Sequence, residues 1–98
     1  RTRNNWTLYP MDPARIYVNF GFWNVVRKHR SYGRGHFNRL VEHKVSALNG
    51  IKSLYADSYY TPEEFDATFN GAGYRALKQR YDPHGKFKDL YAKCVGRA

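Results

Sequence analysis

The sequence is poor in sulfur and in long apolar runs. Of its 98 residues, one is a cysteine, Cys94, and one is a methionine. A single thiol excludes an internal disulfide, and the four histidines do not stand at metal-ligand spacing, so we expect no metal site. No apolar stretch approaches the ~20 residues that a membrane span needs, and no signal peptide is recognisable. We therefore expect no transmembrane segment. The sequence does not identify the compartment, and we favour an intracellular one.

Acidic residues are also scarce, and six of the eight lie in the second half. Residues 1–49 carry nine Lys or Arg against two acids, Asp12 and Glu42, a balance of +7. Residues 50–98 carry eight against six, a balance of +2. A basic half attracts phosphate, nucleic acid, anionic lipid or an acidic protein. Charge alone does not choose among these partners, and a basic nucleic-acid-binding accessory protein stays an alternative, although no RNA-binding signature is present.

Four cations stand close together in a stretch that contains glycine. They are Arg27, Lys28, Arg30 and Arg34. Such a stretch is either a solvated turn or an anion site. We expect these four side chains to take no part in catalysis.

Tyrosine is the commonest aromatic residue, with nine copies against six Phe and two Trp. A tyrosine suits half-buried surfaces and interfaces, because its ring is apolar and its tip is polar. The tyrosines either lie under a partner or fill a small core. A chain of this length makes one domain at most. We expect residues 1–98 to form a single partial domain, with residues 1–13 as an extended lead-in.

Two segments have the pattern of β-strands. Residues 14–23 alternate, with Ile16, Val18, Phe20 and Phe22 on one face, and period two with such residues predicts a strand. Residues 51–56 predict a second, shorter strand. The two runs predict neighbouring strands with the intervening helix packed across them.

Helical signals fill most of the remaining sequence. An apolar stripe predicts a helix over 36–49, with Glu42 outside the stripe and Asn49-Gly50 as its stop. Thr61, Pro62 and Glu64 form a capping box that opens a second helix. Further helices are predicted over 72–81 and 87–96.

The predicted fold class is α+β, with two strands, a crossover helix and C-terminal helices. Two strands make a poor independent sheet, so we expect them to complete a larger one. The unpaired edges of such a sheet would make the isolated chain unstable or prone to aggregate without a partner.

No complete catalytic signature is present, and we do not expect the chain to be an active enzyme alone. The most unusual stretch lies between the second predicted strand and the capped helix, and it contains Tyr55, Asp57, Tyr59 and Tyr60. A phenol can donate a proton or orient a substrate, and a carboxylate can hold the phenol. Asn19, on the first predicted strand, leaves room for a ligand beside it. Alternatively, Asp57 only forms a turn and the tyrosines pack on the next helix.

Three stretches together resemble the C-terminal segment of FAD-linked oxidoreductases of the vanillyl-alcohol-oxidase type, in particular the delta(24)-sterol reductase-like branch. They are Tyr17-Val18-Asn19-Phe20-Gly21-Phe22-Trp23; Gly50-x-x-x-Leu54-Tyr55-Ala56-Asp57-x-Tyr59 with Glu63-Glu64-Phe65 and Phe69 after it; and Tyr81-Asp82-Pro83-x-Gly85-x-Phe87 followed by Asp89-Leu90-Tyr91-x-Lys93. The resemblance covers roughly residues 9–96. Related oxidases carry a lysine shortly after the matching Leu-Tyr pair, whereas this chain has Ala56-Asp57-Ser58.

The resemblance implies a larger flavoprotein. The chain would supply the last strands and closing helices of a cap-domain sheet, and it would shape the substrate pocket beside the flavin. FAD would be bound mainly by a domain or subunit outside these residues, which would be the chain's partner. The site residues implied are Tyr55, Asp57, Tyr59 and Tyr60, with Asn19 facing substrate or cofactor. The alternative is a non-catalytic structural subunit of a large assembly.

Overall fold

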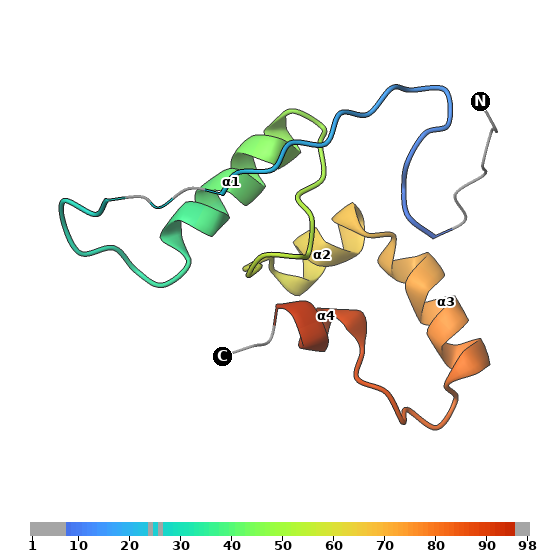
Figure 1. The fold of residues 1–98 in the computed structure, drawn as a ribbon. Helices are drawn as coiled ribbons and strands as arrows, with labels where there is room; N and C mark the ends of the chain where they lie inside the picture. The colour runs from blue at the N-terminus through green and yellow to red at the C-terminus, as the bar shows by residue number, and fades with distance from the viewer. Residues whose placement is uncertain (1–7, 24, 26, 96–98) are drawn as a thin grey trace.

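The computed structural model describes residues 8–23, 25 and 27–95, and in this part of the chain all regular structure is helical. Four helices follow one another along the sequence (Figure 1). They are α1 (His36–Ala47), α2 (Pro62–Thr68), α3 (Gly71–Tyr81) and α4 (Leu90–Cys94). The predicted helices are confirmed, the last of them shorter than expected. The predicted α+β class is wrong, because no strand occurs in the described ranges.

Local capping explains why α2 and α3 begin where they do. The Thr61 hydroxyl accepts the Glu64 backbone N–H at 3.2 Å, and the Glu64 carboxylate accepts the Thr61 N–H at 2.8 Å. This is the capping box that the sequence predicts. Asn70 then adopts a left-handed conformation, with φ of 53°, and its side chain caps α3 through the Gly73 N–H. The two helices therefore meet at a sharp corner and pack on each other.

The core is small and aromatic. Tyr60, Phe65 and Phe69 are each 3–5% exposed, and their rings lie 4.7–6.3 Å apart. Tyr91 of α4 adds an edge-to-face contact with Phe65 at 5.3 Å, and its hydroxyl donates to the Tyr60 carbonyl. Partly buried apolar side chains complete the cluster, namely Ile51, Leu54, Leu90 and Val95.

The predicted strand over residues 14–23 is wrong; this segment, which we call the arm, is extended but unpaired. Figure 1 shows it as a blue trace that joins no sheet. Side chains on both of its faces are exposed, including Phe20 at 75%, Phe22 at 83% and Trp23 at 86%. Alternation specifies which faces are apolar, but a strand also needs a neighbour for its backbone N–H and C=O groups. No described segment of this chain provides one.

The second predicted strand, residues 51–56, is also wrong, and here the cause is local. The Ser53 hydroxyl accepts the Tyr55 N–H, and the Ser58 hydroxyl donates to the Ala56 carbonyl. The Lys52 ammonium donates to the Asp57 carbonyl at 2.9 Å. Side chain–backbone bonds of this kind compete with a sheet ladder. The segment is consequently a folded loop, and the predicted strand–helix–strand packing does not form.

Helix α1 presents an unexpected face to the rest of the chain. Its apolar stripe is largely uncovered, with Leu40 at 48%, Val41 at 42% and the flanking Leu48 at 82% exposed. The side chain that it buries is Glu42, which the stripe had placed outside. The sequence therefore predicts the helix correctly and its buried side wrongly, because a charged pairing decides the packing.

The molecule is open for its size. Its Cα radius of gyration is 15.7 Å, against about 13 Å for a compact domain of this length. Its accessible surface is 8825 Å², whereas a compact monomer of 11.5 kDa exposes roughly 5,800 Å². The arm and the stripe of α1 contribute apolar surface that this chain does not cover.

Candidate functional site

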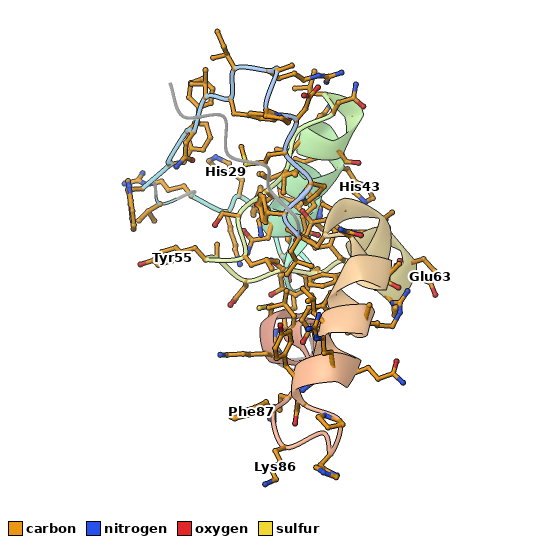
Figure 2. The ribbon with its side chains drawn as sticks, turned by 90° about the vertical axis from the view of Figure 1, so that its right-hand side faces the viewer. His29, His43, Tyr55, Glu63, Lys86 and Phe87 are labelled. Carbon is orange, nitrogen blue, oxygen red and sulfur yellow. The ribbon has the colours of Figure 1, made fainter. Side chains whose placement is uncertain are left out.

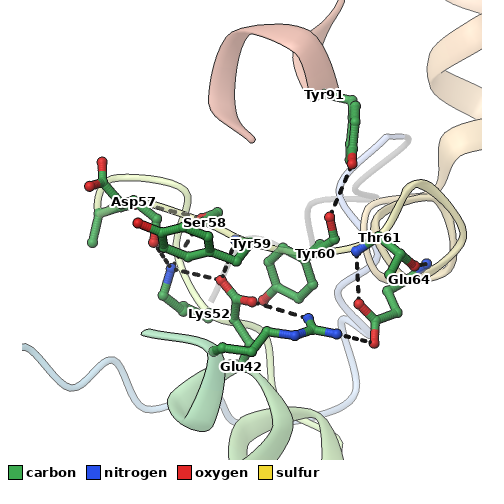
Figure 3. Close-up of polar contacts among 11 residues, drawn as sticks. Glu42, Lys52, Asp57, Ser58, Tyr59, Tyr60, Thr61, Glu64 and Tyr91 are labelled. Carbon is green, nitrogen blue, oxygen red and sulfur yellow. Dashed lines mark hydrogen bonds and ion pairs between the residues drawn. The ribbon is translucent and has the colours of Figure 1, made fainter. Parts of the chain in front are cut away.

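A buried carboxylate on α1 organises the polar contacts of the molecule. Glu42 is 1% exposed, a position that a charge tolerates only when it is paired. The Arg39 guanidinium lies 3.2 Å from its Oε2 and the Lys52 ammonium 3.5 Å from its Oε1. The Tyr59 backbone N–H donates to the same Oε1 at 2.9 Å. Figure 3 shows how these groups converge from α1 and from the loop between α1 and α2.

Lys52 anchors the loop that contains the predicted site. Its ammonium donates to the Asp57 carbonyl and, at 3.1 Å, to the Ser58 hydroxyl. Ser58 is 3% exposed. The Lys52 side chain is itself almost buried. The backbone of residues 57–59 is thus tied to α1 through Lys52 and Glu42, which gives the loop a defined geometry.

Arg39 extends the network to the start of α2. Its guanidinium donates to Glu64 at 2.6 Å as well as to Glu42. The hydrogen bond from Arg39, together with that from the Thr61 backbone, lowers the pKa of the Glu64 carboxyl to about 2. The same hydrogen bond raises the pKa of Arg39 above its ordinary value. Glu64 therefore serves both as a helix cap and as the second partner of Arg39.

Tyr60 belongs to the core. Burial raises the pKa of its phenol to about 12, and the charge of Glu42 contributes in the same direction. A phenol with this pKa stays protonated at neutral pH, so it can donate a proton in a hydrogen bond but cannot act as a base. Its carbonyl accepts from Tyr91. Tyr60 therefore anchors the end of the loop in the core.

Tyr59 lines a pocket of about 340 Å³ between the loop and the start of α1. The other lining residues are Gly33, Arg34, His36, Arg39 and Leu40. Gly35 lies directly beneath the tyrosine ring in a left-handed conformation with φ of 74°. A Cβ at this position would lie 2.4 Å from Tyr59 Cζ, so the ring and the glycine fit only together. Of the predicted site residues, Tyr59 is the one that lines this pocket.

The remaining predicted site residues lie elsewhere on the surface. Tyr55 is 85% exposed and points away from the body of the molecule (Figure 2). Its ring meets Trp23 of the arm edge-to-face at 6.2 Å. Asp57 and Asn19 are both exposed, and Asn19 lies on the arm. The structure thus joins Tyr55 to the arm and Tyr59 to the pocket, but it does not bring the five residues into one cavity.

Sequence reasoning missed the network around Glu42. One signal was available, since Glu42 is the only acid between Asp12 and Asp57, a span rich in Lys and Arg. A lone carboxylate among many cations attracts several of them. The partner Lys52, ten residues later, has no comparable signal, because its insertion depends on how the loop folds.

Two properties of the described residues bear on cofactor and membrane binding. Within them, no group of three or more His, Cys, Asp or Glu residues could hold a metal ion. None of their helices is long and apolar enough to cross a membrane. The pocket lies at the small end of the ~300–1,000 Å³ range of ligand sites, and it does not include Tyr55, Asp57 or Tyr60. A dinucleotide as large as FAD does not fit within it.

Comparison with known proteins relates the chain to sterol reductases. An 87-residue stretch, 89% of the chain, is 32% identical to part of delta(24)-sterol reductase from Rattus norvegicus and to part of the one from Mus musculus. The Homo sapiens protein is 30% identical over the same length. The chain spans 17% of the length of these relatives.

No family profile and no solved structure matches the chain. Most of the chain is nevertheless similar to a segment of a sterol reductase, which agrees with the resemblance seen in its motifs. The narrower assignment to the vanillyl-alcohol-oxidase type stays a prediction.

Proposed function

We propose that this chain is a segment of a FAD-dependent oxidoreductase and that it shapes the substrate pocket beside the flavin. The observation that carries the proposal is its similarity to delta(24)-sterol reductases over 89% of its length. FAD is bound mainly by a part outside the described residues, in keeping with the small size of the pocket. The hydride chemistry belongs to the flavin, and this chain supplies apolar walls and polar groups.

The loop from Tyr55 to Tyr60 is held rigidly, as such a role requires. A group that orients a substrate must be held firmly, because small displacements reduce the rate. Glu42 and Lys52 hold the loop backbone, and Tyr60 locks its end into the core. In this proposal, Tyr55, Asp57 and Tyr59 face the substrate or flavin, with Asn19 beside them. Tyr60, which is buried in the core, holds the loop that carries these residues in place.

The uncovered apolar surfaces support the same proposal. The arm and the stripe of α1 expose side chains that would be buried against the flavin-binding part. Their exposure equally favours the alternative of a structural subunit without catalysis. The two functions differ in one observable, because only the first requires flavin in the native protein.

The experiment is a visible absorbance spectrum of the native protein, followed by turnover of variants. Tyr55→Phe and Tyr59→Phe keep the rings and remove the hydroxyls. We expect turnover to fall, while the free energy of unfolding changes by only about 1 kcal/mol, the scale of one hydrogen bond. Tyr81→Phe is the matched control, since Tyr81 is exposed at the end of α3. Absence of flavin, or an equal loss in the control, would contradict the proposal.

A further inference from the structure

We propose that the basic loop, residues 27–31, is a site of limited proteolysis, where a serine protease that prefers basic residues cuts the bond between Arg30 and Ser31 and releases the arm. The proposal goes beyond the function proposed above and does not depend on a flavin. It rests on the exposure of the loop, on its backbone and on how few contacts hold the arm to the helices.

The basic loop is already accessible to a protease. All five of its residues are exposed, and they lie outside every helix. Figure 1 shows this part of the chain projecting from the body beyond the start of α1. Among the described residues, no backbone–backbone hydrogen bond involves residues 27–31. A protease binds its substrate as an extended segment through the backbone N–H and C=O groups, so an exposed segment with these groups available is the form that it recognises.

Basic residues elsewhere lie in backbone that must open before a protease can bind it. Lys44 is in α1 and Arg80 is in α3, where the hydrogen bonds of the helix occupy the backbone. The Lys86 backbone N–H is bonded to the Asp82 carboxylate at 2.8 Å. Cleavage at such sites follows local unfolding, and the small population of the open form limits its rate. The basic loop needs no such opening and should be cut first.

Arg30 is the residue best placed to enter the primary pocket of the protease. Proteases that are specific for basic residues have an acidic primary pocket, which pairs with a guanidinium. Arg27 and Lys28 precede Arg30, and no acid from residue 13 to residue 41 opposes binding to an acidic cleft. The residue after the cut is Ser31, which is small and uncharged, whereas a basic residue or a histidine follows the two earlier basic positions.

The reaction is a hydrolysis with water as the co-reactant. The serine of the protease attacks the Arg30 carbonyl carbon, and the C–N bond to Ser31 breaks while the nitrogen takes a proton from the protease. Water then adds its hydroxyl to the Arg30 acyl carbon and frees the serine. The products are residues 1–30 with a new carboxyl group and residues 31–98 with a new amine.

Few contacts hold the two products together. Trp23 meets Tyr55 edge-to-face at 6.2 Å, and the Asn70 side chain donates to the Leu8 carbonyl at 3.2 Å. Tyr9 adds a ring contact with the core at 6.3 Å. Before the cut these contacts are intramolecular. After it they must join two molecules, which lose translational and rotational freedom on association. Contacts this few do not outweigh that loss, so the arm dissociates.

Release of the arm would change what the rest of the chain can bind. Asn19 and the exposed aromatic side chains of the arm leave with residues 1–30. The four helices, the network around Glu42 and the pocket beside Tyr59 stay on residues 31–98. The cut therefore acts as an irreversible switch of the surface that the arm provides.

Brief digestion of the full native protein with dilute trypsin, followed by intact-mass measurement, tests the proposal. We expect residues 31–98 to be the first large product. Arg30→Gln should slow its appearance about tenfold or more, because glutamine has no charge for the acidic pocket. Lys86→Gln is the matched control, since Lys86 is exposed outside the helices and lies far from His29 of the loop (Figure 2). It should change the rate less than about twofold, because a distant exposed charge is screened.

Two further measurements complete the test. Thermal melting shows that Arg30→Gln folds, although it loses the contact of the guanidinium with the Tyr32 ring at 5.1 Å. Size-exclusion chromatography of the digested protein should separate residues 1–30 from residues 31–98.

Three results would overturn the proposal. A first cut within a helix or in the turn after α3 would mean that the basic loop is not the most accessible segment. Equal slowing by Arg30→Gln and Lys86→Gln would mean that Arg30 does not occupy the primary pocket. Co-elution of the two fragments would mean that the cut does not release the arm.

Discussion

The arm and the core use the same kind of side chain in opposite environments. Phe20, Phe22 and Trp23 of the arm are at least 75% exposed, whereas Phe65 and Phe69 are at most 5% exposed. The difference lies in the backbone. Around the core, caps and helices satisfy the backbone N–H and C=O groups within a few residues, so the rings can be buried together. The arm is extended and needs backbone partners from elsewhere. Hydrophobic content alone therefore does not decide what this chain buries.

The largest effect should come from truncating the core. Phe65→Ala removes a ring that contacts Tyr60, Phe69 and Tyr91. We expect a loss of about 3–5 kcal/mol in the free energy of unfolding, the usual cost for a buried aromatic ring. Phe20→Ala in the arm should change it by less than about 0.5 kcal/mol. Urea unfolding of both variants measures the contrast, and similar losses would mean that the arm is buried in the folded chain.

An intermediate effect should come from the buried carboxylate. Glu42→Ala leaves Arg39 and Lys52 without their shared partner and frees the Tyr59 N–H. Removing one member of a buried ion pair costs about 3 kcal/mol or more, and partial exposure of Arg39 places this case at the lower end. Glu63→Ala, in the first turn of α2 and exposed, should cost less than about 0.5 kcal/mol. Equal unfolding midpoints for the two variants would show that Glu42 does not hold α1 to the loop.

The smallest effect should be a pH dependence from Glu64. Its pKa is about 2 in the folded chain against an ordinary 4.5. A lowered pKa contributes stability that is present above the unfolded value and is lost as the pH falls from about 4.5 to 2. Glu64 is more than a third exposed, so solvent keeps the contribution below about 1 kcal/mol. Melting temperatures across this range should fall less steeply in Glu64→Gln; an unchanged slope would contradict the assignment.

The helices of this chain were predicted correctly and the strands were not, and the reason is physical. The start of α2 is specified by Thr61, Pro62 and Glu64, and the end of α1 by the left-handed Asn49. Such signals act within one helical turn, so a short window of sequence contains them. A strand depends on a partner that can lie anywhere, and alternation in the arm carries no information about whether that partner exists.

The candidate site was predictable only in part. The loop from Tyr55 to Tyr60 was recognisable from its tyrosines and from the helix start after it. The separation of Tyr55 from Tyr59 was not predictable from the sequence. Tyr55 turns toward Trp23 and Tyr59 toward Gly35, and both contacts join segments that are distant in the sequence. The burial of Glu42 on α1 likewise depends on Lys52, which the loop carries to it.

The contact between Tyr59 and Gly35 has a consequence for evolution. Twenty-four residues separate the two positions, yet a Cβ at position 35 would occupy the space of the ring. A substitution at Gly35 is tolerable only if position 59 becomes smaller, and a left-handed backbone restricts the choice further. In an alignment of homologous sequences, positions 35 and 59 should therefore change together. Lineages that lose the tyrosine should also lose the requirement for glycine on steric grounds.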